Sequence, residues 1–243
     1  MFPIRDLNPS VVTPVVTLTL ILANVLVFFG LQPQTQREGV TFALRHAAIA
    51  CELTTREPLT RAEAQSGECT PNSRDTPLFP QKQLALSVLV SLFLHGGLVH
   101  LAGNMWFLWI FGNNVEEAFG YLGYAALYLV GGVAATFAFV WANPGATDPL
   151  IGASGAIAAV LGAYLVLFPR RLVLSLVFIT LIPVPAVLFL GLWFVGQFGV
   201  ADTGVAWEAH VGGFVVGAAV AFVMREVLLD RVRRAHSMAA YAR

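Results

Sequence analysis

The sequence predicts an all-α integral membrane protein, a bundle of six transmembrane helices with a long structured first loop. Two features of its composition support this fold class. Hydrophobic residues make up 57% of the chain and charged residues 12%, and the mean hydropathy is +0.74, values outside the range of soluble domains. Apolar runs long enough to cross about 30 Å of hydrocarbon also recur along the chain. The net charge is zero and no basic stripe is present, so we expect no nucleic-acid partner.

The first expected span is Val11 to Phe29, because its apolar run is longer than that of a signal peptide and no small-residue cleavage site follows it. The other expected spans are Leu98 to Phe111, Phe119 to Trp141, Ala156 to Phe168, Pro185 to Phe198 and Val205 to Leu229. Pro183 and Pro185 disfavour one unbroken helix over the run that contains them, since proline lacks a backbone donor. We therefore expect Leu172 to Ile182 to be a buried connecting segment.

Residues 32–83 form the one long polar segment, and we expect an enlarged extracytoplasmic loop there. A connection of roughly 50 residues is too long to be plain and suggests some structure of its own. Thr41 to Cys51 is a candidate interfacial helix. If the loop faces an oxidising compartment, Cys51 and Cys69 can form a disulfide. Two free thiols are the alternative.

The arginines predict the orientation in the membrane. Six spans put both termini on one side, and that side carries most of the basic residues outside the long loop, whereas the short loops near Asp148 and Asp202 have none. By the positive-inside rule the termini are cytoplasmic. We therefore expect a cytoplasmic N-terminal segment (1–12), a membrane domain (13–230) and a cytoplasmic basic tail (231–243), with Ser154 near the outer face.

Few polar side chains interrupt the apolar runs, and each requires a reason because polar groups are costly at membrane depth. His100 and Asn104 are four residues apart and share one helix face. His95 lies five residues before His100, so it points elsewhere or lies in a loop. Gln197 and Trp193 are also four apart, on the fifth expected span, and are candidates for a face that meets substrate or for simple packing.

Two faces of small residues bring the remaining polar groups together. Ser154 shares a face with Ala158 and Gly162 on the fourth span. His210 shares a face with the Gly-x-x-x-Gly pair that starts at Gly213, a pattern that lets helix backbones approach closely. Packing these faces together would bring the Ser154 hydroxyl within reach of the His210 imidazole.

That pairing suits nucleophilic catalysis. Serine is a poor nucleophile until a positioned base takes its proton, and histidine titrates near neutral pH. Ser154 also sits at an expected helix N-terminus, where free N–H groups favour developing negative charge, although a serine there is commonly only an N-cap. Glu208 points about 200° away from His210 on a helix, so we expect a Ser-His dyad without an acid.

Five motifs carry a resemblance to a known family. They are, in chain order, His95-x4-His100-x3-Asn104, Phe111-Gly112-Asn113-Asn114-Val115-Glu116, Gly152-Ala153-Ser154-Gly155, Leu192-Trp193-Phe194 with Gln197, and Ala209-His210-Val211-Gly212-Gly213 ending in Gly217. In these motifs the chain resembles the rhomboid intramembrane serine proteases of the bacterial type. The resemblance implies an endopeptidase that cleaves transmembrane segments, with Ser154 as nucleophile, His210 as general base, and His100 with Asn104 as oxyanion hole.

The resemblance also implies a setting for this chemistry. Gly152, Ala153 and Gly155 would supply the backbone of the oxyanion site, and Trp193 and Gln197 would belong to a lateral substrate gate that extends to about residue 207. The implied partners are transmembrane protein substrates and the lipid bilayer, in a bacterial inner membrane. No cofactor is implied, and no metal is expected because the spans offer no Cys, Asp or Glu ligand set.

Two points in the sequence leave alternatives open. Some rhomboid proteases carry an aromatic residue four positions after the nucleophile, which stacks on the histidine. Here that position is Ala158, so another group must hold the imidazole or the imidazole is looser. If Ser154 is only a cap and His210 only a buried histidine, the chain is a catalytically silent rhomboid-like adaptor or chaperone that binds transmembrane helices.

Overall fold

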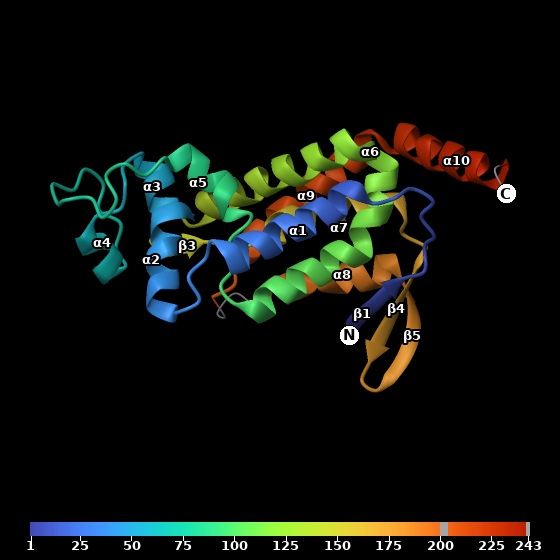
Figure 1. The fold of residues 1–243 in the computed structure, drawn as a ribbon, viewed down its shortest axis with the longest axis horizontal. Helices are drawn as coiled ribbons and strands as arrows, with labels where there is room; N and C mark the ends of the chain where they lie inside the picture. The colour runs from blue at the N-terminus through green and yellow to red at the C-terminus, as the bar shows by residue number, and fades with distance from the viewer. Residues whose placement is uncertain (200–203, 242–243) are drawn as a thin grey trace.

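The computed structural model describes residues 1–199 and 204–241. The elements in chain order are β1 (Phe2–Asp6), α1 (Val15–Gly30), α2 (Gln36–His46), β2 (Ala48–Ile49), α3 (Ala50–Thr55), α4 (Arg61–Ser66), α5 (Leu84–Ser91), α6 (Leu98–Ala142), β3 (Pro149–Leu150), α7 (Ser154–Leu167), β4 (Leu172–Val177), β5 (Thr180–Pro185), α8 (Ala186–Gln197), α9 (Trp207–Val223) and α10 (Arg225–Tyr241). Figure 1 shows an elongated helical bundle with α2 to α5 at one end, and with β1, β4, β5 and α10 at the other.

The apolar helices correspond to the expected spans in position, with one difference in continuity. Expected spans two and three are the two arms of α6, which is broken at Gly120, where φ is 71° and ψ is 166°. Among the described residues, α6 alone is long and apolar enough to cross a bilayer by itself, and α9 with α10 pass that test together although they are bent by 74°. The helices α1, α7 and α8 are apolar but shorter. The fold is thus that of a helical membrane protein, and the count of six spans stays a prediction.

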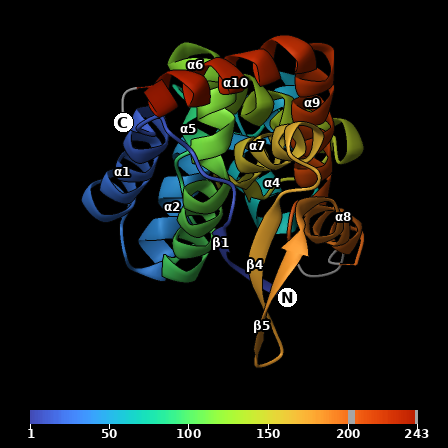
Figure 2. The same cartoon turned by 90° about the vertical axis from the view of Figure 1, so that its right-hand side faces the viewer.

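The segment between α7 and α8 differs from the expectation. Residues 172–182 were expected to be a buried connection, but they form most of an antiparallel hairpin, β4–β5, which β1 extends into a three-stranded sheet of order β1-β4-β5. Figure 2 shows this hairpin reaching away from the helices. Its tip residues Phe178 and Ile179 are each 95% exposed. The prolines that end helical structure here are tolerated because β5 is an edge strand.

The first loop contains more structure than the sequence indicated. The expected helix at residues 41–51 is shifted: α2 ends at His46, the chain runs extended through β2, and α3 follows. Strand β2 pairs with β3, which lies far along the chain just before α7. Cys51 and Cys69 form a disulfide, which settles the choice between a disulfide and two free thiols.

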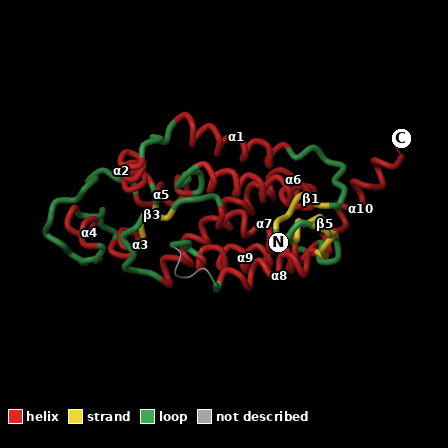
Figure 3. Tube along the Cα trace, turned by 90° about the horizontal axis from the view of Figure 1, so that it is seen from below, coloured by secondary structure: helices red, strands yellow, loops and turns green. Residues whose placement is uncertain are grey.

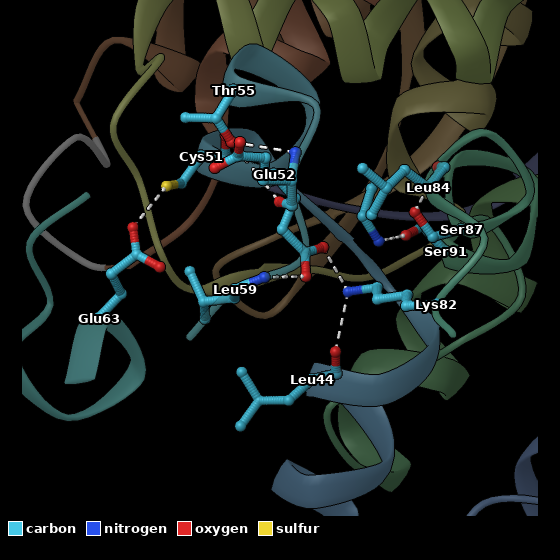
Figure 4. Close-up of polar contacts among 12 residues, drawn as sticks. Leu44, Cys51, Glu52, Thr55, Leu59, Glu63, Lys82, Leu84, Ser87 and Ser91 are labelled. Atoms are coloured by element: carbon cyan, nitrogen blue, oxygen red, sulfur yellow. Dashed lines mark hydrogen bonds and ion pairs between the residues drawn. The ribbon is translucent and has the colours of Figure 1, made fainter. Parts of the chain in front are cut away.

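A buried ion pair holds the first loop together (Figure 4). Lys82 pairs with Glu52, and both side chains are almost wholly enclosed. Lys82 also donates to the carbonyl of Leu44 at 2.8 Å, and the Glu52 carboxylate accepts the N–H of Leu59 at 2.9 Å. Burial raises the pKa of Glu52 and lowers the pKa of Lys82. Each charge is therefore tolerated there chiefly because the other is present.

A second buried carboxylate fixes α1 against α6. Glu116 accepts the backbone N–H groups of Val16 and Thr17, at 2.8 and 2.7 Å, and the Thr17 hydroxyl at 2.6 Å. These N–H groups lie in the first turn of α1 and have no partner within the helix. A negative charge at a helix N-terminus is favourable, so Glu116 caps α1 from the middle of α6.

Helix α7 lies between α6 and α9 and is buried along most of its length (Figure 3). Its contact with α9 is backbone to backbone. A Cβ atom at Gly217 would collide with the carbonyl of Ala159, and one at Gly213 would collide with the carbonyl of Gly155. Four residues separate Gly213 from Gly217 on α9, and four residues in the same chain direction separate Gly155 from Ala159 on α7. The two helices therefore run parallel, with their N-termini at the same end. Glycine is required at both positions for this approach.

The packing predicts the effect of a single methyl group. Gly217→Ala should force α7 and α9 apart and lower the free energy of unfolding by roughly 1–3 kcal/mol or more, the usual cost of overpacking. Gly191→Ala on α8 is the control, because a Cβ there meets nothing within 4 Å. Thermal unfolding of the detergent-solubilised proteins checks this prediction. Equal stability of the two variants would contradict the close contact.

The Lys82–Glu52 ion pair of the first loop predicts a loss of stability that depends on pH. Lys82→Met leaves the Glu52 carboxylate buried without its cation and should cost roughly 3–5 kcal/mol of stability. The loss should grow as the pH rises, because the raised pKa of Glu52 means that ionisation opposes folding. Adding Glu52→Gln to Lys82→Met should recover part of the loss. Unfolding measured at two pH values checks this, and a double variant no more stable than Lys82→Met would refute it.

Candidate functional site

Ser154 is the first residue of α7, and the chain just before it passes close to the His100 side chain. Gly152 has a φ of 129°, a conformation that side chains rarely allow, and a Cβ on it would meet the His100 imidazole. The N–H of Gly152 donates to the carbonyl of Ser91 at 3.0 Å. The first N–H groups of α7 have no helical partner, so this helix end presents donors beside the Ser154 hydroxyl.

The contact between α7 and α9 that the sequence led us to expect is present. Ser154 Oγ and His210 Nε2 lie 2.7 Å apart. His210 is in the first turn of α9, so both side chains come from the same end of two parallel helices. Glu208, as expected from its position on α9, makes no hydrogen bond with His210 among the described residues. Its carboxylate instead accepts a hydrogen bond from the Asn143 side chain at 2.8 Å.

A partner for the other ring nitrogen of His210 comes from α8. Gln197 Oε1 lies 2.7 Å from His210 Nδ1, and the Trp193 ring packs beside the imidazole, with ring centres 6.1 Å apart. These two groups hold the histidine where Ala158 provides no aromatic ring. The sequence pointed to both residues as candidates for a gate face or for simple packing, but not to this contact with His210. The only signal for it was a glutamine four residues after a tryptophan in an apolar run.

His100 and Asn104 lie across from the serine, on the first turns of α6. Both line the same cavity as Ser154 and His210. Asn104 Nδ2 is buried and has no hydrogen-bond partner among the described residues, so a donor is free at this wall. His95 lies in the loop before α6, one of the two places expected for it, but its ring packs edge-on against His100, with centroids 5.2 Å apart.

The cavity has a volume of about 840 Å³. Six of the residues singled out from the sequence line it: Ser154, His210, His100, Asn104, Trp193 and Gln197. Gly152 and Gly155 line it as well, whereas Ala153 is fully buried and does not line it. The expected gate stretch also contains residues 200–203, which lie outside the described residues.

Ser91 is a site residue that the sequence reasoning missed. Its carbonyl accepts the N–H of Gly152, and its hydroxyl accepts the N–H of Ala48 at 2.7 Å. The backbone N–H of Cys51 donates to the carbonyl of Ala146 in the same loop before α7. The loop that delivers Ser154 is therefore attached to the disulfide-closed first loop. A serine inside an apolar run was the only sequence signal.

Curated relatives share segments of this chain. Over 159 residues it is 30% identical to Rhomboid protein 1, mitochondrial, of Saccharomyces cerevisiae, covering 61% of this chain and 45% of the relative. It is 37% identical over 91 residues to the Presenilin-associated rhomboid-like protein, mitochondrial, of Bos taurus, covering 37% of this chain and 24% of the relative. It is 33% identical over 132 residues to the Rhomboid protease GluP of Bacillus subtilis, covering 54% of this chain and 24% of the relative. The chain spans less than half the length of each of these relatives.

The relatives correct one expectation. The sequence motifs led us to expect a bacterial inner membrane, with cytoplasmic termini. That location is wrong, because rhomboid proteins named as mitochondrial, from yeast, zebrafish, cattle, mouse and a plant, stand among the relatives. The motifs that suggested a bacterial protein are thus shared more widely than we inferred.

The family itself follows from a longer match. The model of the Rhomboid domain matches residues 82–227, which is more than half of the chain. The matched region begins at the buried lysine of the first loop and includes α6, α7, α8, α9 and every lining residue of the cavity named above. The chain therefore belongs to the rhomboid family.

Proposed function

We propose that the protein is an intramembrane serine endopeptidase, with Ser154 as nucleophile and His210 as general base. The 2.7 Å contact between Ser154 Oγ and His210 Nε2, inside a cavity among apolar helices, is the observation that carries the proposal. A relative named as a protease, GluP of Bacillus subtilis, supports the same activity.

The proposed reaction is acyl transfer. His210 Nε2 takes the hydroxyl proton as Ser154 Oγ attacks the scissile carbonyl, and the carbonyl oxygen becomes negative. His210 then gives that proton to the leaving amine, which leaves an acyl-enzyme on Ser154. Water in the cavity then gives a proton to His210 as it attacks the ester carbonyl. When the ester C–O bond breaks, His210 returns that proton to Ser154 Oγ, which releases the carboxylic acid and restores both the serine hydroxyl and the neutral histidine.

The negative oxygen needs donors already in place before the attack. In the proposed site these are the free Asn104 amide, His100 and the backbone N–H groups around Ser154. The Asn104 amide is the best supported of the three, because its Nδ2 is buried without a partner among the described residues. Such a group is costly until a ligand accepts its hydrogen bond.

We further propose that six spans form the bundle: α1, the two arms of α6, α7, α8 and α9. Helix α7 has 14 residues, which is about 21 Å at 1.5 Å per residue. This is shorter than a bilayer core of about 30 Å, so α7 begins below the membrane surface and Ser154 is reached from a recessed cavity. The mitochondrial relatives favour a mitochondrial inner membrane as the location.

The proposed substrates are transmembrane segments of other proteins. A transmembrane helix hides its carbonyls in backbone hydrogen bonds, so the substrate must enter sideways and partly unwind before cleavage. Helix α8 is the proposed gate, because it carries Trp193 at the cavity while Leu192 and Val195 are exposed on its outer side. Segments with helix-destabilising and small residues near the cut would be favoured.

The dyad predicts a large and specific loss of activity. Ser154→Ala or His210→Ala should lower cleavage of a transmembrane substrate by at least about 10⁴-fold without changing the unfolding temperature. Ser237→Ala and His236→Ala, on α10, are the controls and should cleave normally. A fluorophosphonate should label wild-type protein at Ser154, as located by peptide mass spectrometry. Retained activity in a dyad variant would refute the mechanism, and absence of label in wild type would favour a silent adaptor.

The oxyanion assignment predicts a smaller effect on turnover. Asn104→Ala should lower kcat by about 10²-fold and leave KM nearly unchanged, because the lost hydrogen bond forms mainly in the transition state. Leu122→Ala, farther along α6, is the control, since its side chain is 88% exposed and does not line the cavity. Steady-state cleavage assays check both, and an unchanged kcat for Asn104→Ala would remove Asn104 from this role.

A further inference from the structure

The last residue of α8, Gln197, makes two hydrogen bonds that link a backbone carbonyl to the proposed catalytic base. Its Nε2 donates to the carbonyl oxygen of Trp193 at 3.0 Å, one helical turn back. Its Oε1 lies 2.7 Å from His210 Nδ1. The side chain is buried, at 9% exposed.

The Trp193 carbonyl determines which way the amide faces. A carbonyl oxygen only accepts hydrogen bonds, whereas an amide has a donor end and an acceptor end. Turning the amide over would place two oxygens against each other at Trp193 and break that bond. The donor end therefore faces Trp193, and Oε1 faces the imidazole.

An oxygen that only accepts then determines which ring nitrogen of His210 carries the proton. Opposite Gln197 Oε1, a bare Nδ1 would present one lone pair to another at 2.7 Å. With the proton on Nδ1, that nitrogen donates to the amide oxygen, and Nε2 keeps its lone pair free toward Ser154. A general base for Ser154 needs this form, because Nε2 must accept the hydroxyl proton.

We infer that Gln197 is a positioning residue that holds neutral His210 in the tautomer protonated on Nδ1. The inference rests on the proposed function and assigns to a neutral amide the orienting task that a carboxylate performs in a Ser-His-Asp triad. Among the described residues, the other charged or titratable groups that line this cavity are Glu208, His100 and Asp148. Glu208 is bonded to Asn143, and in the described part of the chain the ring nitrogens of His210 bond to Gln197 and Ser154 instead. Trp193 serves twice, through its carbonyl and through its ring beside the imidazole.

The first test reads the tautomer directly and does not depend on activity. ¹⁵N NMR of histidine-labelled protein in detergent, with His210 assigned by loss of its signals in His210→Ala, distinguishes protonation at Nδ1 from protonation at Nε2. We expect Nδ1–H in wild type and in Ser154→Ala, and loss of that preference in Gln197→Met, which keeps the length but removes the acceptor. Nε2–H in wild type, or an unchanged preference in Gln197→Met, would overturn the inference.

The second test reads the consequence for turnover. Gln197→Met should lower kcat roughly 10- to 100-fold, the usual effect of removing the group that orients a functional histidine, while KM and the unfolding temperature stay near wild type. Gln197→Glu retains an acceptor for the Nδ1 proton but loses the donor to the Trp193 carbonyl, so it should recover kcat only in part. Val223→Met, at the exposed C-terminal end of α9 and away from the cavity, is the control and should cleave normally. Equal kcat in Gln197→Met and Val223→Met would overturn the inference.

The two proposals fail in different ways. If wild-type protein neither cleaves nor labels with fluorophosphonate but shows Nδ1–H at His210, the protease proposal fails and the orienting contact stands. If wild-type protein cleaves while His210 carries its proton on Nε2, the protease proposal stands and the assignment to Gln197 is wrong.

Discussion

The close approach of α7 and α9 is the constraint on which the rest of the structure depends. Two helices that carried ordinary side chains at their interface would stand too far apart for a short serine to touch a histidine on its neighbour. At Gly213 and Gly217 the α9 backbone instead meets carbonyl oxygens of α7. Because the helices are parallel, their first turns lie side by side, and Ser154 and His210 meet there. The contact between Ser154 and His210 therefore depends directly on how closely α7 and α9 pack.

The parts of the site that the sequence predicted are those governed by helical periodicity. Helical spacing placed His100 with Asn104 on one face, and His210 with Gly213 and Gly217 on another. The two histidines and Asn104 line the cavity, and the two glycines lie at the contact between α9 and α7. The parts it missed depend on contacts between distant segments. An apolar run with prolines does not distinguish a buried connector from a hairpin, so β4 and β5 were unexpected. The role of Gln197 beside His210 was missed because no spacing rule relates a residue on α8 to one on α9.

The first loop shows a second way in which distant segments combine. Its disulfide, its buried ion pair and the short β2–β3 ladder together fix the chain that precedes α7. Ser91 connects the first loop to the chain before α7, since its hydroxyl accepts the N–H of Ala48 and its carbonyl accepts the N–H of Gly152. The sequence indicated some structure in this loop and allowed the Cys51–Cys69 disulfide, but it did not indicate the ion pair or the β2–β3 ladder. The ladder could not be predicted from local pattern because β2 pairs with residues about a hundred positions away.

The location of Gln197 has a consequence for timing. In the proposed mechanism the residue that orients the base is carried by α8, the helix proposed to move when a membrane segment enters the cavity. An outward movement of α8 would draw the Gln197 amide away from His210. The base would then be correctly oriented only when α8 has returned to its place against α9, so entry of a segment and its cleavage would be separate steps.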